Sequence, residues 1–157
     1  MLRRGWLSNL WALALLAAGC AAAIGQAPGL VLTVEDVDRG RALAREPVEA
    51  GARIDLTYVH STEGRPVRAT FRVEADGSLR LVETAYPSVG PGLPAGPEAS
   101  VLIEDGLIVT RAPGPPLREF RLRPLPLTRH RLILPSGRAL DLSTLVEPGA
   151  AVRLTVR

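Results

Sequence analysis

Apolar and polar residues alternate along most of the chain after residue 29, and this pattern predicts short β-strands. Residues 54–60 alternate in this way, and apolar residues within 69–73 alternate with a row formed by Arg68, Thr70 and Arg72. One face of such a strand meets a core and the other meets solvent. The same short alternation recurs at residues 30–34, 79–81, 101–103, 107–109, 120–122, 132–134, 140–142 and 152–156. We therefore expect about nine to ten short strands.

Turn-forming residues separate these segments. Glu104-Asp105-Gly106, between two apolar runs, is the strongest hairpin signal in the chain. Other turns are indicated at Asp76-Gly77, Ser136-Gly137 and Pro148-Gly149. Short strands at intervals of roughly 8–12 residues are typical of sandwiches and barrels. We expect one all-β domain over residues 30–157, an antiparallel β-sandwich or a partly open barrel, with one helical turn at most in residues 39–49.

The first 25 residues have the composition of an export signal or a membrane anchor. Arg3 and Arg4 precede an apolar stretch, expected to be helical, that is followed by small residues. Three outcomes remain open: lipidation at Cys20 in a box that resembles a lipobox, cleavage beside Ala21-Ala22-Ala23, or no cleavage. An uncleaved segment 7–24 approaches the ~20 residues that span a bilayer.

All three outcomes place the rest of the chain on the periplasmic side of the inner membrane, after a linker over residues 26–29. Two of them, the lipid and the uncleaved helix, anchor the domain to the membrane. We favour an anchored domain over a free one.

The net charge argues against nucleic-acid binding. All 19 basic residues are Arg, against 16 acidic residues, and without Arg3 and Arg4 the balance is 17 − 16 = +1. Residues 31–110 carry 8 Arg and 13 acids, whereas residues 111–157 carry 9 Arg and 3 acids. The second half either presents a solvated surface without a partner or forms a basic face toward anionic lipid or an acidic protein. That face would comprise Arg118, Arg121, Arg123, Arg129, Arg131 and Arg138.

His60-Ser61 is the only pair that suggests a hydrolase. Adjacent residues of an extended strand point to opposite faces, so His60 is not placed to activate Ser61. No Gly-x-Ser-x-Gly motif occurs, and no spacing ties Asp55, Glu63 or Asp141 to the pair. We expect no catalysis and assign the pair to hydrogen bonding of turn backbone groups, with a hydrolase that depends on both residues as the minor alternative.

Metal and cofactor sites are not expected either. One cysteine and two histidines do not supply a Cys/His zinc cluster. His130 lies between Arg129 and Arg131, whose charges oppose protonation of its ring.

Two proline- and glycine-rich segments connect strands. Residues 86–97 form a connection of twelve residues, which is either functional or a stiff crossover between sheets. Residues 112–116 are expected to be a simple linker.

Two blocks of the sequence give a specific resemblance. Residues 56–63 (LTYVHSTE), followed by Pro66-Val67 and Phe71-Arg72-Val73, and the later segment 86–94 (YPSVGPGLP) resemble the two motifs of domain-of-unknown-function family 1850. The resemblance extends over roughly residues 30–157. It departs from the family at Arg68-Ala69, where acidic residues are usual, and at Pro91, where the family tends to Ala.

The resemblance implies a role in association. Members of this family are often encoded beside TRAP-type transporters with TAXI-type binding proteins, so an accessory or interaction module of such a transporter is expected. A structural envelope domain without a small ligand is the alternative. If the two motifs meet at one end of the sandwich, the contact residues are Tyr58, His60, Ser61, Glu63, Tyr86, Ser88, Gly90, Gly92, Leu93 and Pro94.

Overall fold

A computed structural model describes residues 29–87 and 100–157. The leader with Cys20 lies outside the described residues, and so does the expected leader helix. The same holds for five of the expected contact residues: Ser88, Gly90, Gly92, Leu93 and Pro94.

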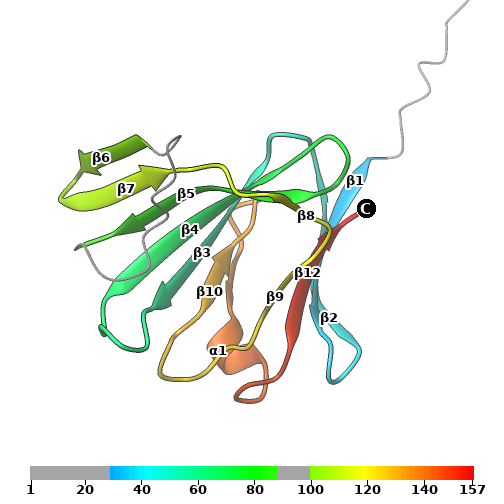
Figure 1. Cartoon of the computed structure of the whole chain (residues 1–157). Helices are drawn as coiled ribbons and strands as arrows, with labels where there is room; N and C mark the ends of the chain where they lie inside the picture. The colour runs from blue at the N-terminus through cyan, green and yellow to red at the C-terminus, as the bar shows by residue number, and fades with distance from the viewer. Residues whose placement is uncertain (1–28, 88–99) are drawn as a thin grey trace, which may run out of the picture.

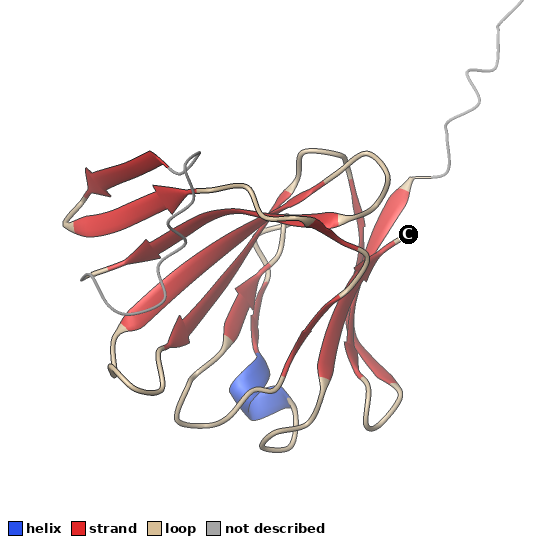
Figure 2. Ribbon diagram, viewed as in Figure 1, coloured by secondary structure: helices blue, strands red, loops and turns tan. Residues whose placement is uncertain are grey.

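The described residues form two antiparallel sheets that face each other (Figures 1 and 2). We call the four-stranded one sheet A, in the order β2-β1-β12-β9, and the eight-stranded one sheet B, in the order β11-β10-β3-β4-β5-β7-β6 with β8 paired to β5. Sheet A comprises β1 (Leu30–Asp36), β2 (Arg41–Val48), β9 (Phe120–Leu122) and β12 (Val152–Val156). Sheet B comprises β3 (Arg53–Val59), β4 (Pro66–Val73), β5 (Leu79–Tyr86), β6 (Ser100–Glu104), β7 (Leu107–Arg111), β8 (Pro116–Leu117), β10 (Arg131–Ile133) and β11 (Ala139–Asp141).

The core lies between the two sheets and is built from the apolar faces that the alternation predicts. Leu32 and Leu154 of sheet A and Ile54 of sheet B are completely or almost completely buried. Phe71 on β4 packs against Phe120 on β9 with a centroid distance of 4.6 Å, which joins the two sheets directly. Burial of these faces is the main favourable term in folding.

The all-β prediction is confirmed, and the predicted hairpin around Asp105 is present as β6 and β7. Residues 39–49, for which we expected one helical turn at most, hold no helix, because Arg41–Val48 form β2. Arg41-Ala-Leu-Ala-Arg45 has good helix formers, but antiparallel pairing with β1 overrides that local preference. The short helix is instead α1 (Leu142–Leu145).

The segment 112–116 is also more than a linker. Its last residue begins β8, and the amide of Gly114 donates to the carbonyl of Leu81 at 2.9 Å. The additional strands β2 and β8 raise the described total above the nine or ten expected. No helix in residues 29–87 or 100–157 is long and apolar enough to cross a membrane.

Sheet B is wider than sheet A. In Figure 1, β6 and β7 lie on the left, on the side of sheet B away from β1, β2 and β12. All five residues of β6 are exposed.

Candidate functional site

The strand register brings the described parts of the two sequence motifs to the same end of sheet B. Tyr58 near the end of β3 is paired with Val67 on β4, and Arg68 on β4 is paired with Ala85, the neighbour of Tyr86 on β5. Only β4 therefore separates Tyr58 from Tyr86. Tyr86 is buried, and its hydroxyl lies 2.7 Å from that of Thr110 on β7.

His60 begins the turn that joins β3 to β4. Its amide donates to the carbonyl of Arg65, and the amide of Gly64 donates to the carbonyl of His60, both at 2.8 Å. Gly64 has φ +63°, a conformation that glycine adopts without strain. Backbone groups thus close this turn, where we expected the side chains of His60 and Ser61. Ser61 and Glu63 are exposed, and within the described residues Nδ1 of His60 is buried without a hydrogen-bond partner.

The ring of His130 stacks on Tyr58, with centroids 5.4 Å apart and planes 15° from parallel. Its Nδ1 lies 2.8 Å from the hydroxyl of Thr128. Burial lowers the pKa of His130 and raises the pKa of Tyr58. The direction for His130 is the expected one, but its cause is burial and not the adjacent arginines. At neutral pH the pair is therefore uncharged.

A loop of residues 123–130 covers the end of β3. The amide of Val59 donates to the carbonyl of Thr128 at 2.7 Å. The hydroxyls of Thr128 and Ser143 both donate to the carbonyl of Leu125, at 3.0 and 2.9 Å. This fixed conformation leaves Leu125 45% and Leu127 72% exposed.

We call the turn 60–65 and the loop 123–130 together the distal end. The loop follows Leu122, which is paired with Val152 at the start of β12, whereas Leu30 at the start of β1 lies near Arg157 at the opposite end of sheet A. Figure 1 shows both distal segments at the lower edge and the start of β1 at the upper right. The distal end therefore points away from Leu30, where the described domain begins.

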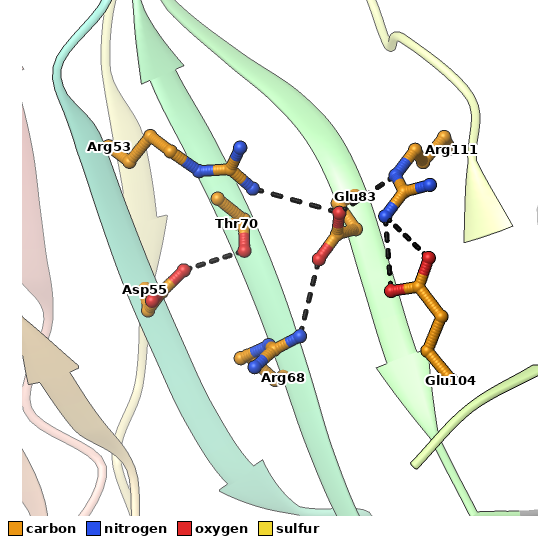
Figure 3. A network of polar contacts seen from close by, with 7 residues as sticks. All are labelled: Arg53, Asp55, Arg68, Thr70, Glu83, Glu104 and Arg111. Atoms are coloured by element: carbon orange, nitrogen blue, oxygen red, sulfur yellow. Dashed lines mark hydrogen bonds and ion pairs between the residues drawn. The ribbon is translucent and has the colours of Figure 1, made fainter. Parts of the chain in front are cut away.

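Glu83 is the centre of a charge network on the outer face of sheet B, which the sequence reasoning missed (Figure 3). Its side chain is only 10% exposed, and its carboxylate oxygens lie 3.0 Å from Arg111, 3.3 Å from Arg68 and 3.7 Å from Arg53. Arg111 also pairs with Glu104 at 2.9 Å. These two carboxylates raise the pKa of Arg111.

Asp55 lies beside this network, and its carboxylate accepts a hydrogen bond of 2.6 Å from Thr70. In the network itself, three arginines meet two carboxylates, those of Glu83 and Glu104. The members come from β3, β4, β5, β6 and β7, and only the strand register brings them together. The alternating row of Arg68, Thr70 and Arg72 was the one signal of it in the sequence. The network joins strands.

The arginines of the second half do not form one basic face. Arg121 lies on β9 of sheet A and Arg131 on β10 of sheet B. Arg118 pairs with Asp76 at 3.3 Å and Arg121 with Glu119 at 2.7 Å, while Arg123 donates to the carbonyl of Gly149. Two of the six arginines expected in that face, Arg118 and Arg121, are thus paired with acidic residues of the domain.

The described residues hold no group of three His, Cys, Asp or Glu side chains suited to a metal ion. β3 ends at Val59, so His60 and Ser61 lie in the turn that follows it and not on the strand. The His130 ring is hydrogen-bonded to Thr128, and Ser143 donates its hydroxyl proton to a carbonyl. Neither serine is therefore set up as a nucleophile with a histidine base.

The described residues define a two-sheet antiparallel β-domain, and the loop at its distal end presents two exposed leucines, Leu125 and Leu127. Residues 54–142 match the family model Domain of unknown function (DUF1850). The match covers 142 − 54 + 1 = 89 of the 157 residues, and the chain belongs to this family. It spans β3 to β11 and so contains all of sheet B except Arg53, the first residue of β3, together with the distal end. No curated protein and no solved structure matches the chain significantly.

Proposed function

We propose that this DUF1850 protein is an exported accessory module of a TRAP/TAXI-type transporter, and that it binds a transporter subunit through the distal end. The observation that carries the proposal is the exposed pair Leu125 and Leu127, held on the loop beside the His60 turn. Large apolar side chains fixed in solvent are favourable contacts for another protein, because binding removes them from water.

The construction of the loop supports a binding role. Leu125 and Leu127 alternate with Pro124 and Pro126, and proline restricts the backbone before any partner arrives. The hydrogen bonds of Thr128 and Ser143 to the carbonyl of Leu125 restrict it further. A preorganised loop loses little conformational entropy on binding, which favours affinity.

The position of the distal end favours one kind of subunit. If the leader anchors the domain, the membrane lies on the side of Leu30, and the distal end is directed away from it. A soluble TAXI-type binding protein is within reach there, whereas a subunit embedded in the bilayer is not. We therefore propose the soluble binding protein as the partner.

Contact is also favoured over catalysis. The neutral His130 has its Nδ1 hydrogen-bonded to Thr128, and the turn at His60 is closed by backbone bonds. The same groups that a hydrolase needs for proton transfer are used here to hold two loops together.

The test is solute uptake in cells that lack the gene and carry variants of the full chain. We expect Leu127→Asp to reduce uptake by the proposed TRAP/TAXI-type transporter and to weaken binding of its soluble binding protein at least tenfold. Val31→Asp is the matched control, since Val31 is 39% exposed and lies near the start of β1. Because both sites are exposed, we expect thermal unfolding of both variants to stay close to wild type. Wild-type uptake and binding in Leu127→Asp would overturn the proposal.

A further inference from the structure

β6 forms an edge of sheet B, with β7 on its inner side. Val101 is 60%, Leu102 42% and Ile103 81% exposed, and no strand of the described residues pairs with the outer side of β6. An exposed apolar edge strand offers a row of unpaired backbone donors and acceptors to another strand.

Among the described strands, β2, β9 and β11 at the other ends of the two strand orders carry protection that β6 lacks. β9 and β11 are each three residues long. β2 carries Arg41, Arg45 and Pro47, and its register with β1 shifts at a bulge. Short length, charge, proline and bulges are the usual means of blocking edge-to-edge pairing. The apolar centre of β6, Val101 to Ile103, carries neither a charge nor a proline.

The hairpin turn determines which backbone groups face outward. Asp105 (φ +51°) and Gly106 (φ +75°) form a two-residue turn, and Glu104 is paired with Leu107. The residues that close such a turn are hydrogen-bonded to each other, and bonded pairs alternate along the hairpin. The amides and carbonyls of Val101 and Ile103 therefore point to the open edge.

We propose that a second copy of this chain binds here, with the two β6 strands antiparallel and in a register centred on Leu102. Val101 of each copy then lies opposite Ile103 of the other, and the two Leu102 side chains meet on the two-fold axis. The two Val101–Ile103 pairs form about four backbone hydrogen bonds. Sheet B becomes continuous across the dimer.

The sequence of β6 favours a second copy over an unrelated strand. Read in this register, Ser-Val-Leu-Ile-Glu places every apolar residue opposite an apolar residue, and Glu104 opposite Ser100. The two Glu104 residues lie at opposite ends of the contact, and each already pairs with Arg111 at 2.9 Å. No like charges oppose each other, as a two-fold contact requires.

The contact is short, so we expect a weak dimer with a dissociation constant in the micromolar range, about −8 kcal/mol. The dimer contact uses the β6 edge, which does not include any residue of the distal end. The dimer proposal therefore does not depend on whether a transporter subunit binds. Failure of one proposal therefore leaves the other standing.

Disulfide trapping in membranes that contain the full chain tests the register. Two Leu102→Cys residues face each other in a pair without backbone hydrogen bonds, where Cα atoms are about 4.5 Å apart and a disulfide forms. We expect Leu102→Cys to give covalent dimers well above the wild-type background, which includes any contribution of Cys20. Ile103→Cys alone is the matched control and stays at background, because its two copies are offset by two residues. The double variant Val101→Cys/Ile103→Cys crosslinks again.

A proline variant tests the backbone contact. Ile103→Pro removes an outward amide that takes no part in the hairpin, so we expect the purified full chain to keep its unfolding temperature while dimer affinity falls at least tenfold in analytical ultracentrifugation. A monomer at all concentrations for wild type would overturn the proposal. Crosslinking of Leu102→Cys to a different protein would also overturn it, in favour of a heterologous strand on the same edge.

Discussion

At the scale of single residues, Glu83 shows how a nearly buried acidic side chain is accommodated on the outer face of a sheet. Its position depends on a bulge in β5, where Thr70 is paired with Glu83 and Phe71 with Leu81. The bulge places Glu83 on the outer face beside Arg68, Arg111 and Arg53. A carboxylate with so little exposure requires these partners, since burial of an unpaired charge is costly.

We expect Glu83→Gln to lower the free energy of unfolding by about 1–3 kcal/mol, because three guanidinium groups lose their common counterion. Glu104→Gln is the matched control: its side chain is 46% exposed, and an exposed ion pair contributes at most about 1 kcal/mol. Urea denaturation of both variants measures the difference. Equal losses would show that the network does not depend on Glu83.

His130 gives a prediction for the pH dependence of stability. Burial lowers its pKa in the folded state from the ordinary value of 6.5, so the unfolded chain binds a proton more readily. Stability is therefore full above pH 6.5 and decreases as the pH falls toward the folded pKa of His130. Glu74, Asp76 and Glu119 have pKa values lowered by their hydrogen-bond partners, so their contribution is lost only at more acidic pH.

The measurement is the free energy of unfolding between pH 7.5 and about 5.5. We expect wild type to lose stability over this range and His130→Gln to lose less, although the variant starts lower because the contact with Tyr58 is gone. The same series with His60→Gln separates the two histidines. A wild-type slope that persists unchanged in His130→Gln would contradict the assignment.

At the scale of elements, the turns determine how the two sheets meet. The turn between β4 and β5 contains Gly77 with φ +76°, and a Cβ atom there would lie 2.9 Å from the carbonyl oxygen of Val156 on β12. The backbone of the β4–β5 turn in sheet B therefore lies very close to the backbone of β12 in sheet A. Glycine is therefore required twice, for its conformation and for the space.

Gly77→Ala should reduce the free energy of unfolding by about 2–4 kcal/mol, the sum of a left-handed backbone and a contact that must shift. Gly137→Ala tests the first part alone, since Gly137 has φ +83° and a Cβ atom added there would meet no other atom within 4 Å. We expect this control to lose about 1–2 kcal/mol. Thermal unfolding measures the loss of stability in both variants. Equal losses would mean that the contact with Val156 adds nothing to the effect of Gly77→Ala.

Local patterns predicted most elements and long-range register determined the rest. The Asp105-Gly106 turn was predictable because two adjacent strands and their turn lie within a few residues. β2 was not predictable, because its residues favour a helix locally and form a strand through pairing with β1. The Glu83 network and the approach of residues 123–130 to Val59 depend on strand pairing between distant segments, which alternation does not encode.

At the scale of the whole molecule, the domain has two exposed apolar surfaces, for which we propose different roles. The distal end carries Leu125 and Leu127 on a preorganised loop, and the β6 edge carries apolar residues whose outward side pairs with no described strand. The start of β1 lies at the end of sheet A opposite the loop. A leader attached there leaves the distal end free for a partner, which is the central claim of the proposed function.

Site-specific photo-crosslinking in intact cells tests this claim most directly. A crosslinking residue replaces Leu127 at the distal end or, as the matched control, Glu49, which is exposed in the turn after β2 near the start of β1. We predict that position 127 captures the soluble TAXI-type binding protein and that position 49 does not. Capture of this protein from neither position, while both variants are exported and folded, would contradict the account.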